Sequence, residues 1–476
     1  MFIVRKIARS VHLSLLIIAS ICLAVIMITI SRSPSVGAAN GAKDPAVTNA
    51  TQKILEGQRS FRFDTFGDQA FWGDTLKLHQ AIEGAALGGV GPGVSPKTAL
   101  AVGLKIDVEA LPNDLLQQIQ QGKVNLNDPA VTLALLKLNS VVGLTGFFNS
   151  AGTLQSVGIQ CALCHSTVDN SHPALCFDQV IPNPGTGCIG HRLDGWANRD
   201  LNVGGIVALA PDLSAIAKLL NTSQSTVRTV LNSWGPGKFD AELLLDGKAF
   251  NPQQVTDGVV TGTNVPGASL IPPAFGLGGV NLHTWVGWGS VPHWNAFVAN
   301  LEMHGVGRFF DPRLNNAAQF PIAAANGFAD LPHINPDDDL ITSKLAALQL
   351  YQLSIPSPKP TVRVDKAAAA RGDALFSGKA GCNNCHAEPL WTEPGWNLHQ
   401  ASEVCVDSFQ ADRGPDMRYR TSPIGAISTH FKGGFYHDGR FADLNAVVNH
   451  YNSCMNLGLT AAERSDLVQY LLSLKF

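Results

Sequence analysis

The pentapeptide Cys-x-x-Cys-His occurs twice in this chain of 476 residues, as CALCH at 161–165 and as CNNCH at 382–386. Such motifs admit two interpretations, namely zinc-binding or redox-active thiols, or sites of covalent haem attachment. A structural zinc site needs a second pair of Cys or His ligands at a defined spacing. No Cys-x-x-Cys or His-x-x-x-His pair follows either motif at such a distance. The spacing therefore favours haem over zinc.

Covalent haem needs two thiols that reach the vinyl groups on one edge of the porphyrin, with a histidine directly after the second thiol. Both motifs meet this requirement within about one helical turn. We therefore expect two c-type haems. Their attachment residues would be Cys161, Cys164, Cys382 and Cys385, and their proximal iron ligands would be His165 and His386.

The beginning of the chain predicts export. Basic residues Arg5, Lys6 and Arg9 precede an apolar run over about residues 11–30, and small residues follow at 36–38. This order is typical of a signal peptide over residues 1–38, although the run is also just long enough to remain as a membrane anchor. Residues 1–38 hold four of the 34 basic residues and none of the 37 acidic ones, so 30 basic residues remain against 37. An acidic exported protein is a poor candidate for nucleic-acid binding.

Eight of the nine cysteines lie beyond the export segment. Four belong to the two motifs, and the others divide evenly between them. Cys176 and Cys188 follow the first motif, while Cys405 and Cys454 follow the second. Because exported proteins retain disulfides, we expect the pairs Cys176–Cys188 and Cys405–Cys454, with free buried thiols as the alternative.

The second motif has the surroundings of a small cytochrome c domain. Asp365 is placed to cap a helix that ends near Gly378, and Thr460 with Glu463 forms a capping box before a final amphipathic helix. The Pro-rich segment 353–365 reads as a linker. The acidic stretch 334–340 could bind calcium, but a solvated loop accounts for it more simply.

A weak internal repeat supports a duplicated domain. WGSVPHWNAFVANLEM (288–303) aligns with DGRFADLNAVVNHYNS (438–453) at an offset of 150, with four identities. Both segments pattern as a glycine turn followed by a helix, and both follow a haem motif. The first lies much farther from its motif. This difference predicts a long insertion in the first half.

One stretch resembles a known family. YRTSPIGAISTHFKGGFYHDGRFADLNAVVNHYN (419–452) resembles the second domain of the bacterial di-haem cytochrome c peroxidases and of the related methylamine-utilisation di-haem enzyme. NLEMHG (300–305) resembles the Glu-Met segment of their first domain. The likeness is specific over 370–476, patchy over 155–310 and absent over about 40–150. The chain departs from the family in its insertion and in Trp288, where an Asp usually precedes the glycine.

The resemblance implies a mainly α fold of two cytochrome c-like haem domains facing each other, the first with a long insertion. The domains would span residues 39–352 and 366–476, joined by the linker 353–365. It also implies a periplasmic oxidoreductase that uses a small oxidant such as hydrogen peroxide and a redox-protein partner. A two-haem electron carrier without enzymatic activity is the alternative.

The resemblance also suggests what lies on the distal side of each haem. The family's second haem takes a Met or a Tyr from the helix after His-Asp-Gly, and Tyr451 holds that place here. Neighbouring candidates are His430, Met417, His450 and Met455, and His437 would lie close by without binding iron.

The repeat sets Leu301 opposite Tyr451, and leucine cannot bind iron. The first haem would then be open, with Glu302 beside it as a catalytic acid and base. His283, His293 or His304 could instead bind the iron and close the site.

Overall fold

The computed structural model describes residues 44–172, 187–256, 259–260, 265–332, 334–360 and 362–475. The chain divides into two compact units, Met1–Gln52 and Lys53–Phe476. Helix α2 (Pro45–Phe63) begins in the first unit, and the other described elements belong to the second. The expected export segment lies outside the described residues. Within the described ranges, no helix has the length and hydropathy that a membrane span requires.

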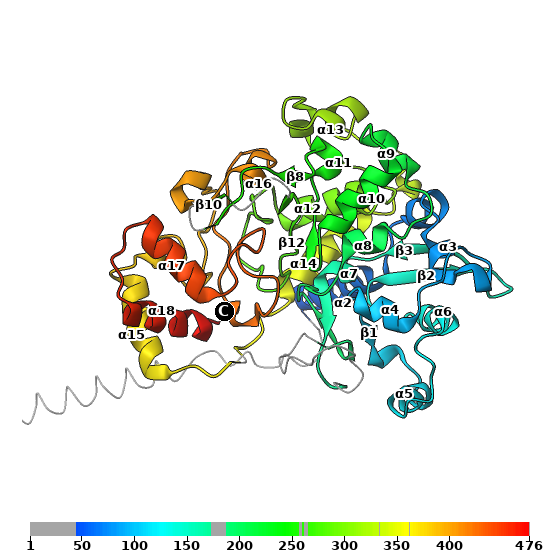
Figure 1. Ribbon diagram of the computed structural model, residues 1–476, viewed down its shortest axis with the longest axis horizontal. Helices are drawn as coiled ribbons and strands as arrows, with labels where there is room; N and C mark the ends of the chain where they lie inside the picture. Colours follow the sequence, from blue (N-terminus) through cyan, green and yellow to red (C-terminus); the bar gives the residue numbers. More distant parts are fainter. Residues whose placement is uncertain are drawn as a thin grey trace, which may run out of the picture. The chain divides into compact units, whose positions relative to one another are not determined.

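The second unit is rich in helices, in agreement with the expected mainly α class (Figure 1). Beyond α2, its α-helices are α3 (Leu78–Glu83), α4 (Pro96–Ala101), α5 (Asn113–Gln120), α6 (Pro129–Lys137), α7 (Ala162–His165), α8 (Val203–Val207), α9 (Ser214–Leu219), α10 (Gln224–Ser233), α11 (Leu243–Asp246), α12 (Val291–Phe297), α13 (Pro321–Asn326), α14 (Leu345–Ser354), α15 (Lys366–Ser377), α16 (Phe409–Asp412), α17 (Leu444–Cys454) and α18 (Ala461–Ser473).

The described strands are short and form sheets of two strands each. The pairs are β1 (Ile106–Asp107) with β5 (Ile189–Gly190), β2 (Leu144–Phe148) with β3 (Leu154–Ile159), β4 (Ser166–Val168) with β6 (Arg192–Asp194), β7 (Lys238–Phe239) with β12 (Ser269–Leu270), β8 (Phe250–Asn251) with β11 (Val265–Pro266), and β9 (Val255–Thr256) with β10 (Val259–Val260). Among these described pairs, β1–β5 is parallel and the others are antiparallel. Sheets of this size support loops but cannot form a core of their own.

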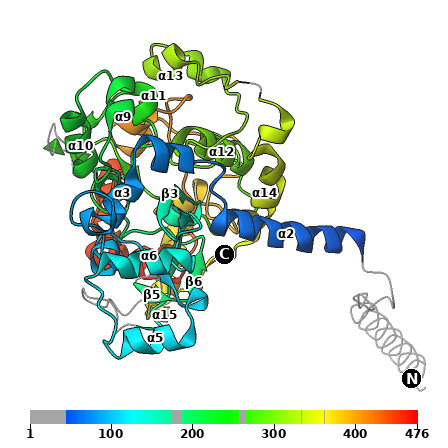
Figure 2. The same ribbon diagram turned by 90° about the vertical axis from the view of Figure 1, so that its right-hand side faces the viewer.

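The first haem motif follows directly from the β2–β3 hairpin. The hairpin pairs Leu144 with Ile159 and has a bulge at Phe147/Phe148, and α3 and α6 pack beside it (Figure 2). Gly143 begins the hairpin with φ of 85°, and a Cβ there would lie 2.2 Å from Cα of Leu163. Only glycine permits this approach. The hairpin is thereby pressed against α7, which carries the first motif.

An aromatic cluster supports the segment that contains Glu302. Trp288 is almost fully buried and contacts Trp294, Phe297 and Phe320. Its indole N–H donates to Oδ2 of Asp311 at 3.1 Å, which satisfies the one polar group of this side chain. Trp288 therefore has a packing role at the position where the family usually has an Asp.

The C-terminal helices form a cluster with its own core, whose buried members all lie between Phe376 and Leu474. Helices α15 and α18 lie side by side, in yellow and red in Figure 1. They cross at Gly372, where a Cβ would meet the carbonyl oxygen of Asp466 at 2.2 Å. The expected caps are confirmed: Asp365 accepts bonds from the first turn of α15, and Thr460 and Glu463 form the capping box of α18.

The expected linker has little regular structure. Helix α14 ends at Ser354, and the described residues from Ile355 to Val364 belong to no helix or strand. The division of the chain into domains at 353–365 remains a prediction.

The two halves of the repeat differ in detail. The second is one regular helix, α17, whose N-cap Asp443 accepts a bond from the backbone N–H of Ala446. The first is the short α12 followed by the π-helical segment η5 (Val298–Glu302). Because a π-helical turn rotates the side chains that follow it, a register carried over from α17 does not fix where Leu301 and Glu302 point.

Candidate functional site: two Cys-x-x-Cys-His pockets

The first motif forms helix α7 and the residue before it. Cys161 and Cys164 are free, half-buried thiols, and burial raises the pKa of each to about 12. Two backbone bonds hold the loop: the N–H of Gly195 donates to the carbonyl of His165 at 2.8 Å, and that of Asn198 donates to the carbonyl of Cys164 at 2.9 Å. The neutral thiols share one short helix, as thioether formation with a single porphyrin requires.

The His165 imidazole is oriented by one hydrogen bond. Its Nδ1 lies 3.1 Å from the carbonyl oxygen of Pro272, which can only accept, so Nδ1 carries the proton. Burial lowers the pKa of His165 to about 4, and the ring is therefore neutral. Nε2 then keeps a lone pair. This is the state of an iron-binding histidine, whose second nitrogen donates to a carbonyl group.

The second motif repeats this arrangement on a different scaffold. Gly381 adopts a left-handed conformation and begins the 3-10 turn η9 (Cys382–Asn384), and the N–H of His386 donates to the carbonyl of Cys382 at 2.9 Å. His386 donates through Nδ1 to the carbonyl oxygen of Trp391 at 3.0 Å. Burial lowers the pKa of His386 as well. Trp391 in turn donates to the carbonyl of Lys475, which fixes this acceptor.

The residues of both pockets fit covalent haem. Each supplies two free thiols and a neutral imidazole whose lone pair is available on Nε2. Both histidines are half-buried.

Two other groups of side chains have the spacing of metal ligands. Cys385, Glu393 and His399 form one, but His399 donates to both Glu393 and Glu403, and Glu393 also accepts from Thr421. The other is Asp407, His437 and Asp438. Both of its carboxylates pair with Arg440. Protein donors thus already engage the carboxylates in each group.

Glu302 lies at the wall of a cavity of about 380 Å³. The cavity has mainly apolar and aromatic walls, which include Trp72, Trp234 and Leu301. Oε1 of Glu302 is buried and has no hydrogen-bond partner among the described residues. Burial raises the pKa of Glu302 well above its usual value, and Glu242 and Asp240 raise it further. Glu302 is also close enough to Cys164 to raise the pKa of that thiol.

The three histidines that could close the first site have different surroundings. His293 donates to Asp311 at 3.1 Å, and His283 is buried with its Nε2 directed at the carbonyl of Val280. His304 stacks on Phe71 with ring centroids 3.6 Å apart, and it lines the same cavity as Glu302. Burial lowers its pKa to about 4. Of the three, only His304 lies in this cavity wall.

Tyr451 lies deep in the protein beside the second motif. Burial raises the pKa of its phenol, and Cys382 and Cys385 raise it further. The rings of Tyr451 and Tyr436 lie 6.1 Å apart. Helix α17 thus brings Tyr451 close to both thiols of the second motif.

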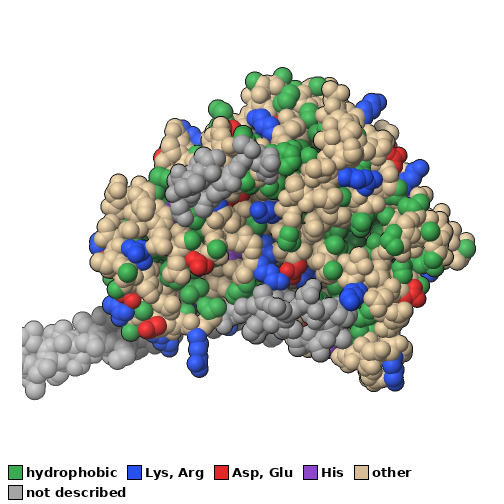
Figure 3. Space-filling view, viewed as in Figure 1, with side chains coloured by type: hydrophobic (Ala, Val, Ile, Leu, Met, Phe, Trp, Pro, Cys, Tyr) green, Lys and Arg blue, Asp and Glu red, His purple; other side chains and the backbone are tan. Residues whose placement is uncertain are grey.

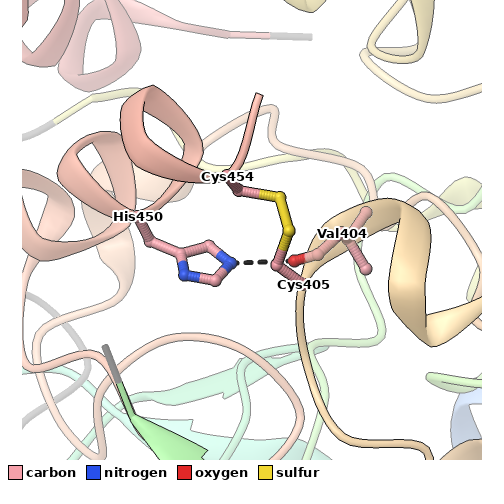
Figure 4. Close-up of a disulfide and its surroundings, with 4 residues drawn as sticks. All are labelled: Val404, Cys405, His450 and Cys454. Carbon is pink, nitrogen blue, oxygen red and sulfur yellow. Dashed lines mark hydrogen bonds between the residues drawn. A yellow bond between two sulfur atoms is a disulfide. The ribbon is translucent and has the colours of Figure 1, made fainter. Parts of the chain in front are cut away.

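The other candidate ligands of the second iron are either engaged in hydrogen bonds or exposed. His450 donates through Nε2 to the carbonyl of Val404 at 2.8 Å, as Figure 4 shows. Met417 and Met455 are exposed, at 60% and 45%. His430 is enclosed, and its Nε2 accepts a hydrogen bond from Arg199. His437 stacks on Tyr419 with ring centroids 5.0 Å apart and is buried.

Cys405 and Cys454 form a disulfide with a Cα–Cα distance of 5.9 Å (Figure 4). Cys454 is the last residue of α17, so the bridge ties the end of the helix that carries Tyr451. Cys188 is also disulfide-bonded. Its expected partner, Cys176, lies outside the described residues.

The acidic stretch 334–340 contains a 3-10 turn (Pro336–Asp338). The carboxylate of Asp339 accepts bonds from the backbone N–H groups of Ile341 and Thr342 and from the Thr342 hydroxyl. It also lies 3.9 Å from Arg308. Asp339 is therefore engaged by protein donors, which favours the solvated-loop interpretation over calcium.

Sequence reasoning did not find the acids around Glu302. Asp240 lines the same cavity, and Glu242 is a second buried carboxyl whose charge acts on Glu302. Burial raises the pKa of Asp240 to about 6 and that of Glu242 to about 7. Both lie between the first haem motif and α12, far from Glu302 in sequence. No local pattern marks them.

No protein-family model matches the chain. A segment of 123 residues is 30% identical to the methylamine utilization protein MauG of Methylorubrum extorquens, and it covers 23% of this chain and 35% of that protein. Another of 231 residues is 28% identical to the cytochrome-c peroxidase IdrP1 of Denitromonas iodatirespirans, covering 37% and 60%. Each match spans less than two thirds of the relative's length.

Two solved structures align with about half of the chain, each with a TM-score of 0.30. They are a MauG-like protein associated with microbial copper homeostasis, at 17% identity over 47% of this chain and 79% of the other, and the diheme peroxidase BthA of Burkholderia thailandensis, at 15% identity over 51% and 78%. These alignments are too loose to place residues. The sequence matches confirm the resemblance drawn from the motifs: the chain is a relative of the bacterial di-haem cytochrome c peroxidases and the methylamine-utilisation di-haem enzymes.

Proposed function

We propose that this protein is an exported di-haem c-type oxidoreductase with one reactive and one electron-transfer haem. Covalent haem at Cys161/Cys164 and at Cys382/Cys385 would supply one-electron redox chemistry. The observation that carries the proposal is Glu302, a buried carboxyl with an unpaired oxygen at the wall of an apolar cavity. Its influence on the pKa of Cys164 supports a position near the first motif. Carboxyls of this kind are typical of general acid and base sites.

Glu302 would handle the protons of peroxide reduction. Hydrogen peroxide takes up two electrons and two protons and gives two waters. The electrons would come from a donor redox protein. Glu302 would accept a proton from one oxygen of peroxide and return it to the oxygen that leaves. Burial raises the pKa of Glu302 well above its usual value, which is the direction that general acid and base catalysis near neutral pH requires of a carboxyl group.

Tyr451 would give the second haem a lower reduction potential than the first. An oxygen ligand from tyrosine favours ferric iron and lowers the reduction potential. Tyr451 lies beside Tyr436, with ring centroids 6.1 Å apart. The neighbourhood of Cys382 and Cys385 supports this assignment.

The remaining parts of the proposal concern organisation. The two haem domains would span 39–352 and 366–476, and the separate core between Phe376 and Leu474 supports the second. Residues 1–38 would direct export to the periplasm, and the protein would bind the membrane only if they remain attached.

A two-haem electron carrier is the second candidate. It is favoured by His304, which lines the same cavity as Glu302 and is kept neutral by burial. If His304 bound the first iron, neither site would be open and peroxide would not react quickly.

The test is Glu302→Gln, which keeps the size of the side chain but removes its proton exchange. Peroxide-dependent oxidation of a reduced donor should slow by about 10²–10⁴, while the absorption spectra of both haems stay nearly unchanged. Glu109→Gln, a change at an exposed glutamate, is the matched control. An equal rate in the Glu302 variant and the control would exclude the proposed role of Glu302.

A further inference from the structure

Among the described residues, five arginine side chains carry guanidinium groups enclosed in the protein, and two of the five have no carboxylate partner there. Arg192 pairs with Asp107 at 3.0 Å, Arg413 pairs with Asp240 and Asp246, and Arg440 pairs with Asp407 and Asp438. Arg199 and Arg420 pair with no carboxylate of the described residues. A guanidinium stays charged in proteins, and an enclosed charge without a counter-charge is strongly unfavourable. These two arginines therefore require an anion from elsewhere.

Arg199 lies in a locally cationic region. The adjacent carboxylate of Asp200 is already used by Lys105 at 2.7 Å and by Lys432. Arg199 itself donates from Nη2 to Nε2 of His430, while its Nε and Nη1 are buried without a partner among the described residues. Burial lowers the pKa of Arg199 to about 9. Burial lowers the pKa of Lys238, Asp438 raises it, and the nearby charge of Arg199 lowers it again.

Arg420 is enclosed in the same way at a second place. Its Nη1 donates to the carbonyl of Leu282 at 2.7 Å, and its Nε is buried without a partner in the described part of the chain. Burial lowers its pKa to about 10. Its charge also acts on His283, whose pKa is lowered to about 4, first by burial and then by Arg420.

Each arginine is tied to one motif. Arg199 follows Asn198, whose N–H donates to the carbonyl of Cys164 at 2.9 Å. Arg420 precedes Thr421, whose carbonyl accepts from the hydroxyl of Thr392. Thr392 directly follows Trp391, the acceptor for His386.

Each arginine also donates a hydrogen bond to a residue of the other proposed haem domain. Arg199 donates to His430, and Arg420 donates to Leu282. Figure 3 shows Lys and Arg side chains gathered near the middle of the visible face, between the side of α15, α17 and α18 and the side of α8 and α10.

We propose that Arg199 and Arg420 bind the propionate carboxylates of the two haems, Arg199 at the His165 haem and Arg420 at the His386 haem. This inference rests on the proposed covalent attachment of haem. Each haem carries two propionates, and the planar guanidinium fork matches a carboxylate with two parallel hydrogen bonds. The carboxylates would supply the anions that these two arginines lack. They would also link each haem to both proposed haem domains, because each arginine contacts the other domain.

The experiment is a potentiometric titration of the purified di-haem protein, of Arg199→Gln and of Arg420→Gln. Loss of a positive charge beside a haem favours the oxidised state, so each variant should lower the midpoint potential of one haem and leave the other unchanged. We expect at least a tenfold change in the reduction equilibrium, which corresponds to about 59 mV for one electron. Arg371→Gln is the control, because Arg371 is exposed and paired with Asp466 at 2.7 Å.

Two further variants keep the test decisive if the Gln variants fail to fold. Arg199→Lys and Arg420→Lys retain the charge but lose the fork, and each should shift the equilibrium of the same haem by about threefold in the same direction. Unchanged potentials in a protein whose mass contains two haems would overturn the inference and leave haem attachment intact. A wild-type mass with fewer than two haems would overturn haem attachment itself.

Discussion

The two Cys-x-x-Cys-His sites share the surroundings of their histidines and differ in the side chains that distant segments bring near them. In both, the histidine donates through Nδ1 to a backbone carbonyl, from Pro272 in the first pocket and from Trp391 in the second. The side chains brought in from distant parts of the chain differ. Near the first motif, Glu302 lines an apolar cavity and its charge acts on Cys164, whereas near the second Tyr451 lies beside Tyr436.

This difference teaches that the pentapeptide and its surroundings have separate roles. The motif presents two thiols and a neutral imidazole whether it lies in α7 or in the turn η9. The groups that would decide reactivity arrive through tertiary packing. Two copies of the Cys-x-x-Cys-His pattern could therefore serve one reactive and one electron-transfer centre.

The largest expected effect concerns the feature that the two motifs share, their pairs of haem-binding cysteines. Replacement of both Cys161 and Cys164 by Ala should remove one covalent haem, and replacement of both Cys382 and Cys385 should remove the other. Intact-mass measurement should find each double variant lighter by one haem of about 616 Da, since thioether bonds hold the group. Each pair serves as the control for the other. A wild-type protein with zinc and no haem mass would contradict the account at its base.

A smaller effect concerns the disulfide Cys405–Cys454, which anchors the end of α17 near the second pocket. It closes a loop with a sequence separation of 49. Its replacement by two alanines should lower the free energy of unfolding by about 2–4 kcal/mol, because the unfolded chain gains freedom. Urea denaturation of the wild-type and the double variant measures this difference. A change below about 0.5 kcal/mol would show that the bridge does not support this pocket.

The smallest effect concerns an acid found beside the first motif. Oδ2 of Asp68 accepts a bond from the N–H of Ile159, its Oδ1 is buried and unpaired among the described residues, and burial raises its pKa to about 9. The usual value in an unfolded chain is about 3.9. The folded state thus binds this proton more tightly. Its contribution to stability is complete below pH ~4 and falls as the pH rises toward 9.

Asp68→Asn removes this dependence. Between pH 5 and 8 the wild-type should lose more stability than the variant, by about 1 kcal/mol or more, since one pKa unit corresponds to about 1.4 kcal/mol. Denaturation at several pH values gives the comparison, and Asp74→Asn, at an exposed aspartate, is the control. Parallel pH profiles for the wild-type and Asp68→Asn would exclude a protonated Asp68 in the folded protein.

Local patterns in the sequence predict the parts of this molecule that depend on local contacts. The caps of α15 and α18 follow from Asp365 and from Thr460 with Glu463, because a cap involves residues only two or three positions apart. The pentapeptide likewise contains its own thiols and histidine. These features need no knowledge of the fold.

Contacts between distant segments could not be predicted in this way. Asp240 and Glu242 act on Glu302 only because α11 and η5 are brought together, and Arg199 meets His430 only through the junction of two halves. The role expected for Glu302 rested on a resemblance to a known family. Because Glu302 lies in a π-helical turn, the register of the internal repeat could not predict where its side chain points. The need of Arg199 and Arg420 for an anion depends on their burial, which the sequence does not give.

The central claim is that the two iron sites are unequal, and a cyanide titration of the ferric protein tests it most directly. Wild-type protein should bind one cyanide rapidly per two haems, at an open site beside Glu302. Tyr451→Phe should change the spectrum and potential of the other haem without slowing this first binding. Rapid binding of no cyanide, with both spectra low-spin, would show that His304 or another side chain closes the first site. Rapid binding of two in the wild-type would show that Tyr451 does not hold the second, and either result would contradict the account.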